Sequence, residues 1–281
     1  MTVDHQERLA RIGLAWMASR GAAIPAAPAT ESPMRRWKGM AASRPQVDPA
    51  RVAGEAEATG WRIVVPGDDE WPPAPPGIED PSAGAPWALW VRGDGDLRAA
   101  TRRSVAVLGT RASTTYANQV SALLGEDLAA RGWTVVAACA LGADRHALVA
   151  AAHGDAPPIG VFADGPGLRA FERREPALRA LLVSDAPPDT PSRGDRYLAR
   201  QDLITYLSAG VVIVEAGWRG NTLATVAYAR ARGRLVMAVP GAITSPASAV
   251  THFLIQGGAQ LVDSAESISA TLLAATAGGA A

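Results

Sequence analysis

The chain has 281 residues, enough for one sizeable α/β domain and a small accessory region. Apolar residues make up 48% and charged residues 19%, as in globular proteins with a buried core. The formal net charge is zero, which argues against a protein that coats duplex DNA by bulk electrostatics. No apolar run reaches the ~18–20 residues of a membrane helix, and the first residues do not resemble a cleavable signal. We therefore expect a cytoplasmic protein that makes no membrane contact.

The chain offers few residues for catalysis or metal binding. Its single cysteine, Cys139, excludes an intramolecular disulfide and is typical of a reducing compartment. One cysteine and four scattered histidines do not assemble a zinc or iron–sulfur site, so we expect no metal and no cofactor. Cys139 is interpreted as a small buried residue at a strand end. No nucleophile or acid–base pair stands out, which predicts a protein that is not an enzyme.

Residues 1–57 are predicted to form a small helical region. Between Glu7 and Met17 the apolar residues recur at close to helical spacing, and Gly21 is a suitable stop. Residues 22–50 are rich in Ala, Pro and Ser and have little periodicity, so they are predicted to be a loop or linker.

From Trp61 onward the pattern changes to short apolar runs. Two strands are expected near 61–65 and 86–94, and from Ser104 strands and helices alternate. The later strands are predicted at 104–108, 133–138, 159–163, 180–183, 210–214 and 234–239, and the helices between them at 116–131, 144–153, 168–179, 198–208 and 221–232.

These later strands are continuously apolar, which is typical of parallel strands buried on both faces. The sequence predicts an α/β fold: a Rossmann-like, doubly wound, mostly parallel sheet with a small N-terminal helical region. The expected divisions are 1–57, an extended Rossmann-like domain over 58–268, and a flexible tail over 269–281. Loops that follow the strands then meet along one edge of the sheet, where open α/β sheets bind ligands.

The first candidate loop is Gly109-Thr110-Arg111, which opens a predicted helix. Glycine permits close approach of a ligand, helix N-terminal amides favour anions, and arginine is a forked phosphate donor. A tight turn is the alternative role of Gly109. Gly142 lies in the loop after the next strand, and Asp144 is predicted to cap the helix that follows.

A second candidate phosphate site precedes the helix at 222–231 and consists of Arg219, Gly220, Asn221 and Thr222. Tyr197 and Arg200 are three residues apart and share a helix face, as expected where a base stacks and a phosphate is neutralised. A core tyrosine beside a surface arginine fits the spacing equally well. No acidic residue occurs at 97–125 or 216–262, although both windows carry arginines, which suggests a local anion-binding face or a chance distribution.

Taken together, these loops resemble the DNA-processing protein A (DprA/Smf) family over most of residues 59–268. The resemblance is carried by the ordered set 66–72, 87–93, 104–111, 142–144, 184–188, 197–200, 211–216, 219–225, 233–234, 239–241 and 252–255. It implies a Rossmann-like domain that binds single-stranded DNA in a positive pocket, forms a homodimer and helps to load a RecA-type recombinase during DNA uptake. It also implies that Arg111, Tyr197, Arg200 and Arg219 hold phosphates or stack bases.

The chain departs from the family pattern at several positions. The family's loop after the second strand usually begins with Ser-Gly and contains a further Gly. This chain has Ala137, Ala138 and Cys139 there, and their β-carbons are expected to crowd a phosphate. Asp202 replaces an arginine and is expected to weaken DNA binding.

Two alternative functions stay open. The protein could be a nucleotide-binding or nucleotide-hydrolysing enzyme with Glu215 as the base, or a degenerate family member retained for binding to other proteins.

Overall fold

A computed structural model describes residues 3–24, 32–42, 47–73 and 85–278, with side chains as far as Ala275. Within these residues the chain forms one nine-stranded sheet. Its strands are β1 Arg62–Val64, β2 Leu89–Arg92, β3 Ser104–Gly109, β4 Thr134–Ala138, β5 Ile159–Val161, β6 Leu181–Ser184, β7 Gly210–Glu215, β8 Leu235–Ala238 and β9 Gln260–Leu261. Their spatial order is β1-β2-β6-β5-β4-β3-β7-β8-β9, and the antiparallel pairs among these strands are β1 with β2 and β2 with β6. The doubly wound, mostly parallel sheet is confirmed.

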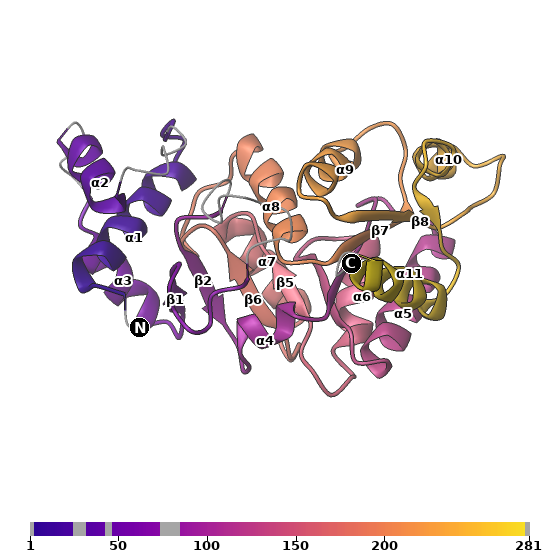
Figure 1. Cartoon of the computed structure of the whole chain (residues 1–281), viewed down its shortest axis with the longest axis horizontal. Coiled ribbons are helices and arrows are strands. Elements are labelled where there is room, and N and C mark those ends of the chain that lie inside the picture. Colours follow the sequence, from indigo (N-terminus) through magenta and orange to yellow (C-terminus); the bar gives the residue numbers. More distant parts are fainter. Residues whose placement is uncertain (1–2, 25–31, 43–46, 74–84, 279–281) are drawn as a thin grey trace.

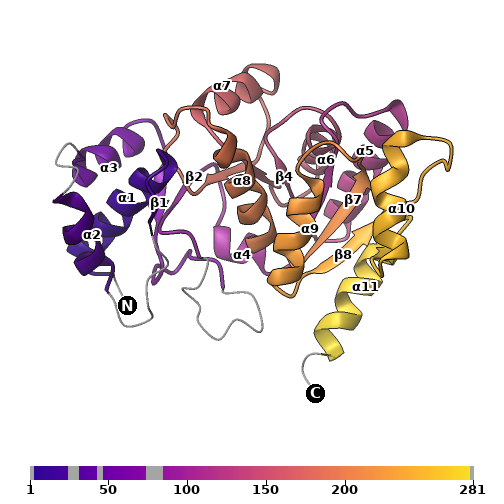
Figure 2. The ribbon, with the colours of Figure 1, turned by 90° about the horizontal axis from the view of Figure 1, so that it is seen from above.

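The helices of the described residues cover both faces and one end of this sheet (Figures 1 and 2). They are α1 His5–Ser19, α2 Pro33–Ala41, α3 Pro49–Glu57, α4 Leu97–Thr101, α5 Thr115–Ala130, α6 Ala143–Ala151, α7 Gly165–Arg174, α8 Gly194–Tyr206, α9 Thr222–Ala231, α10 Ala249–Gln256 and α11 Ala265–Gly278, with a 3₁₀ turn at Pro246–Ser248.

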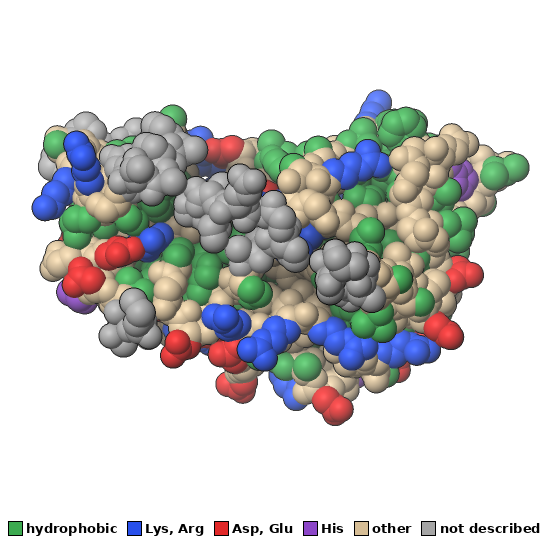
Figure 3. Space-filling model, viewed as in Figure 1, with side chains coloured by type: hydrophobic (Ala, Val, Ile, Leu, Met, Phe, Trp, Pro, Cys, Tyr) green, Lys and Arg blue, Asp and Glu red, His purple; other side chains and the backbone are tan. Residues whose placement is uncertain are grey.

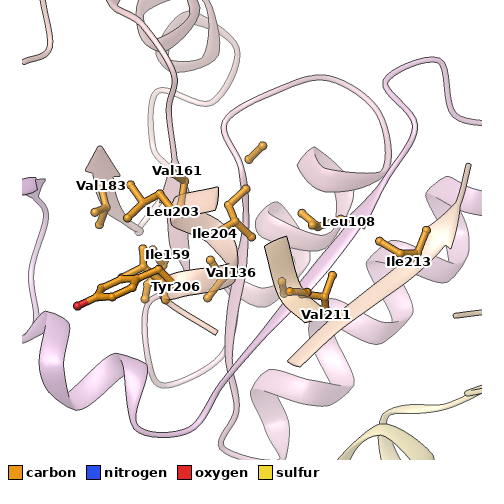
Figure 4. Close-up of a cluster of buried hydrophobic side chains, with 14 of the residues drawn as sticks. Leu108, Val136, Ile159, Val161, Val183, Leu203, Ile204, Tyr206, Val211 and Ile213 are labelled. Atoms are coloured by element: carbon orange, nitrogen blue, oxygen red, sulfur yellow. The ribbon is translucent and has the colours of Figure 1, made fainter. Parts of the chain in front are cut away.

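Alternate residues of each central strand face opposite helical layers. Val105 and Val107 of β3 pack in the layer that contains α5, α6 and α11. Ala106 and Leu108 face the layer that contains α8, α9 and α10. Figure 4 shows the core of this second layer, where leucine, isoleucine and tyrosine side chains from α8 lie over valines of the sheet. Burial on both faces explains why the strand sequences are apolar without alternation.

The N-terminal helices form a unit at one end of the molecule, beside β1 (Figure 1). Ile12 and Val52 of this unit share a buried cluster with Trp61 and Ile63, and Arg8 donates to the carbonyl oxygen of Ile63 at 2.9 Å. The unit therefore packs directly against the sheet. The expected boundary at residues 57 and 58 falls between α3 and β1.

The predicted linker over 22–50 is wrong in its middle part, because α2 occupies Pro33–Ala41. The Ser32 side chain accepts from the amide of Arg35, and Pro33 occupies the first turn, a favourable helix start. The Trp37 ring fits against Gly13 of α1, where an added β-carbon would lie 2.4 Å from it. Within the predicted linker, residues 25–31 and 43–46 lie outside the described residues, and Pro49 and Ala50 already belong to α3.

The predicted flexible tail over 269–281 is also corrected. Helix α11 continues through it to Gly278, and Leu272 is buried in the layer formed with α5 and α6. An added β-carbon at Gly210 of β7 would lie 2.7 Å from Leu272, so the helix packs closely on the sheet. Residues 279–281 lie outside the described part. No helix among the described residues is long and apolar enough to cross a membrane.

The packing of α11 predicts unequal effects for two adjacent leucines. Leu272 is 2% exposed and Leu273 is 52% exposed. Leu272→Ala should lower the free energy of unfolding by about 2–5 kcal/mol, because it leaves a cavity beside the sheet. Leu273→Ala is the matched control and should change it by less than about 1 kcal/mol. Urea unfolding measures both, and equal effects would contradict the packing of α11.

Candidate phosphate-binding site

A cavity of about 410 Å³ lies where β3 and β7 end, at the carboxyl edge of the sheet. Three arginines from three separate segments line it: Arg111 from the loop after β3, Arg200 from α8 and Arg219 from the loop after β7. The predicted site residues that line this cavity are Gly109, Thr110, Arg111, Arg200, Arg219, Gly220, Asn221 and Thr222. The fold thus brings the two candidate loops and the α8 arginine to one place.

Arg200 is the most constrained of these side chains. It is only 7% exposed, and its Nε has no hydrogen-bond partner. Burial lowers the pKa of its guanidinium, and the nearby Asp144 opposes that shift. Arginine nevertheless stays charged in proteins. Arg200 therefore brings a desolvated, incompletely hydrogen-bonded positive charge to the cavity wall.

Tyr197 lies between two of the arginines. The guanidinium carbons of Arg111 and Arg200 are 5.8 and 5.5 Å from its ring centroid. It lines an adjoining hollow of about 180 Å³ rather than the main cavity, and Arg111 and Arg200 line both spaces. A cation–π arrangement of this kind holds the ring and the two charges together.

Gly109 and Gly142 of the predicted site lie where the loops after β3 and β4 are too close together for a β-carbon. Gly142 lines neither space, and at its φ of 83° a β-carbon would lie 2.2 Å from the carbonyl oxygen of Thr110. A β-carbon on Gly109 would lie 2.6 Å from that of Ala143. The loops after β3 and β4 therefore pack directly on each other.

The N-terminus of α5, where we expected a phosphate, already receives a carboxylate of the protein. Glu215 at the end of β7 accepts from the Thr114 backbone amide at 3.0 Å and from its hydroxyl at 2.7 Å. Glu215 is buried and does not line the cavity. Its position gives no support to the hypothesis that it acts as a catalytic base.

The N-terminus of α9, by contrast, opens on the cavity. Asn221 and Thr222 line the space, and the Asn221 side chain makes no capping hydrogen bond. One turn later, Thr225 donates to the Gln201 side-chain oxygen at 3.0 Å, which links α9 to α8 beside Arg200. Uncapped amides at a helix N-terminus favour an anion.

Asp144 does not cap α6 as predicted, because Gly142 holds the N-cap position. The Asp144 carboxylate instead accepts from the amide of Gly109 at 2.9 Å and from that of Ala138 at 3.3 Å. Burial raises its pKa to about 6, and those hydrogen bonds together with the charge of Arg200 limit the rise. Asp144 thus joins the ends of β3 and β4, and it is also one of the residues that line the cavity.

Two departures from the family pattern were expected to weaken phosphate binding: Asp202 and the residues at the end of β4. Asp202 faces Arg232, the C-cap residue of α9, whose guanidinium donates to both carboxylate oxygens at 2.8 and 2.9 Å, and Asp202 does not line the cavity. Ala137 and Ala138 are fully buried in the sheet and line neither space, whereas Cys139 is buried but lines the adjoining hollow. Asp202 and the two alanines therefore do not face the cavity, and crowding by Cys139 stays a prediction.

The sequence reasoning missed other residues of the cavity wall. Gln201 could have been inferred from its position one helical turn after Tyr197, and Thr225 from its position one helical turn after Thr222. Leu141 and Ala140 carry no chemical signal in the sequence. Among the residues that the structure describes, no three His, Cys, Asp or Glu side chains are grouped to hold a metal ion.

The raised pKa of Asp144 makes its contribution to stability depend on pH. A rise from 3.8 to about 6 means that ionisation in the folded state costs about 3 kcal/mol. This cost is absent below the unfolded pKa and reaches its full value as pH rises through the folded pKa. Asp144→Asn removes the titration, so it should destabilise the protein more at about pH 4.5 than at about pH 7.5, by about 2 kcal/mol. Urea unfolding at both pH values tests this, and a pH-independent difference would contradict it.

Comparison with known proteins agrees with this architecture. The sequence model of the family described as DNA recombination-mediator protein A matches residues 62–273. Protein Smf of Escherichia coli is 36% identical over 214 residues, which are 73% of this chain and 55% of that protein. The chain therefore spans little more than half the length of this relative.

Two solved structures share the fold. DNA processing protein A (DprA) from Streptococcus pneumoniae gives a TM-score of 0.71 at 26% identity, with 96% of this chain and 98% of that chain covered. DNA processing protein A from Helicobacter pylori gives 0.62 at 24% identity, with 76% and 96% covered. Since the family model matches well over half of the residues, the chain belongs to the DNA recombination-mediator protein A family.

Proposed function

We propose that the cavity binds the phosphate groups of single-stranded DNA and that the protein acts in DNA processing and recombination without catalysing a reaction. The observation that carries this proposal is the buried guanidinium of Arg200, whose Nε has no hydrogen-bond partner. A buried charge that lacks partners costs free energy, and an anion in the cavity would supply the missing partner.

The surrounding groups suit a phosphodiester strand. Arg111 and Arg219 are exposed and line the same cavity as the uncapped N-terminus of α9. Tyr197 offers a partly exposed ring in the adjoining hollow, which a base can reach only when it is not stacked in a duplex. The protein from Helicobacter pylori, which shares the fold, is described by its single-stranded DNA binding mode.

Removing the charge of Arg200 tests the proposal. Arg200→Met should weaken oligo-dT binding by about 10–100-fold, because one charge-assisted phosphate contact is worth roughly 1.5–3 kcal/mol. The slope of log affinity against log salt should also flatten by about 0.7, the amount expected for one contact on a single strand. Fluorescence anisotropy over a salt series measures both quantities.

The matched control is Arg102→Ala, because Arg102 is exposed and precedes β3, at the opposite end of that strand from the cavity. This variant should bind like the wild type, whereas Arg111→Ala should weaken binding as Arg200→Met does. Circular dichroism melting separates loss of binding from loss of fold. Absence of oligo-dT binding by the folded wild type at about 50 mM salt would refute the proposal. Binding of a mononucleotide alone would favour the nucleotide-enzyme hypothesis.

We further propose that the bound strand is passed to a RecA-type recombinase, as the family description of a recombination mediator suggests. Since strand binding and partner binding would use different surfaces, Arg200→Met should still co-elute with the recombinase in size-exclusion chromatography. Loss of co-elution in that variant alone would contradict separate surfaces. The expected homodimer stays a prediction that light scattering can measure.

A further inference from the structure

An exposed pair of aromatic rings lies beside the phosphate cavity. Trp218, in the loop between β7 and α9, is 60% exposed, and Phe253 of α10 is 50% exposed. Their ring centroids are 5.3 Å apart, with planes inclined at 58°. All eight tryptophans lie in the described residues, and Trp218 is the one that is exposed. A large ring held at the surface by a second ring is a feature that core packing does not explain.

The backbone places Trp218 at the rim of the cavity. Its neighbours in sequence, Gly217 and Arg219, both line the space that contains Arg200. Gly220, which follows, has a φ of 123° and turns the chain into α9 with open space around it. The Trp218 indole is therefore next in sequence to Arg219, a positively charged residue that lines the cavity.

The charges around the pair favour a polyanion. The window 216–262, which contains α9, α10 and both rings, has no acidic residue, and Arg219 and Arg230 in it are exposed. In Figure 3 the area over α9 and α10, at the upper right, shows apolar and uncharged side chains with Lys or Arg and no Asp or Glu. A phosphate backbone that leaves the cavity in this direction meets no carboxylate.

We propose that Trp218 is a stacking platform for a base of the same single strand whose phosphate is held at Arg200. Phe253 is a positioning residue that keeps the indole in place through its ring contact. Aromatic rings next to a positive groove are the usual means by which proteins hold unpaired bases without sequence preference. This inference rests on the proposed function, and it adds a second base-binding position on the far side of the cavity from α8.

The test compares two strands and three variants. One strand is oligo-dT, and the other has the same length and phosphates but abasic sugars throughout. Trp218→Ala should weaken oligo-dT binding about tenfold and leave binding of the abasic strand unchanged, because only a stacking contact is lost. The salt slope should not change, since no phosphate contact is removed. Trp218→Phe keeps a ring and should recover most of the affinity, and Phe253→Ala should show a smaller loss than Trp218→Ala.

The matched control is Leu223→Ala, a neighbouring apolar position of α9 that is 40% exposed but has no ring. It should leave binding of both strands unchanged. If Arg200→Met abolishes binding while Trp218→Ala does not alter it, the stacking platform is refuted and the proposed function stands. If the wild type binds neither strand, the proposed function fails first. A Trp218→Ala variant with unchanged DNA affinity but a lower mass in light scattering would assign the pair to contact between two copies of the chain.

Discussion

The carboxylate of Asp144 holds together the part of the sheet on which the site depends. Parallel strands end in loops, and nothing in the ladder of hydrogen bonds fixes how the loops after β3 and β4 sit on each other. The Asp144 carboxylate accepts hydrogen bonds from the amides of both Gly109 and Ala138, and so holds the ends of β3 and β4 in a fixed position relative to each other. Glu215 does the same between β7 and the start of α5 through Thr114. The two buried carboxylates thus set the edge on which the cavity is built.

Burying the Asp144 carboxylate costs free energy in the folded state. Ionised Asp144 is unfavourable in its buried position, and Arg200 is the charge that partly compensates it. Arg200 remains incompletely hydrogen-bonded, because its Nε has no partner. Natural proteins tolerate such local conflicts mainly at functional sites, where a ligand completes what the fold leaves open. Under the proposed function, the same two residues link the stability of the sheet edge to the binding of an anion.

The sheet could be predicted because every central strand is an unbroken apolar run, and the loops followed from the topology alone. The residues that escaped prediction are those whose partners are distant in sequence. An aspartate two residues after a glycine has the same local pattern whether it caps α6 or bridges β3 and β4, as Asp144 does. Asp202 resembled an anion in the binding path because its partner, Arg232, lies 30 residues away. Helix α2 is too short to display a period, although Ser32 and Pro33 mark its start.

The zero net charge of the chain conceals how its charges are used. Many acidic side chains are paired away from the cavity, as Asp202 is with Arg232 and Asp185 is with Arg196. Within the described part of the chain, the arginines of the cavity form no salt bridge within 4 Å, although Arg200 interacts with the charge of Asp144; they are Arg111, Arg200 and Arg219. Pairing elsewhere cancels the total, while among the residues that line the cavity three arginines face a single carboxylate, that of Asp144. Under the proposed function, a neutral protein binds a polyanion at a defined place, and its affinity for the strand depends on a few contacts rather than on bulk charge.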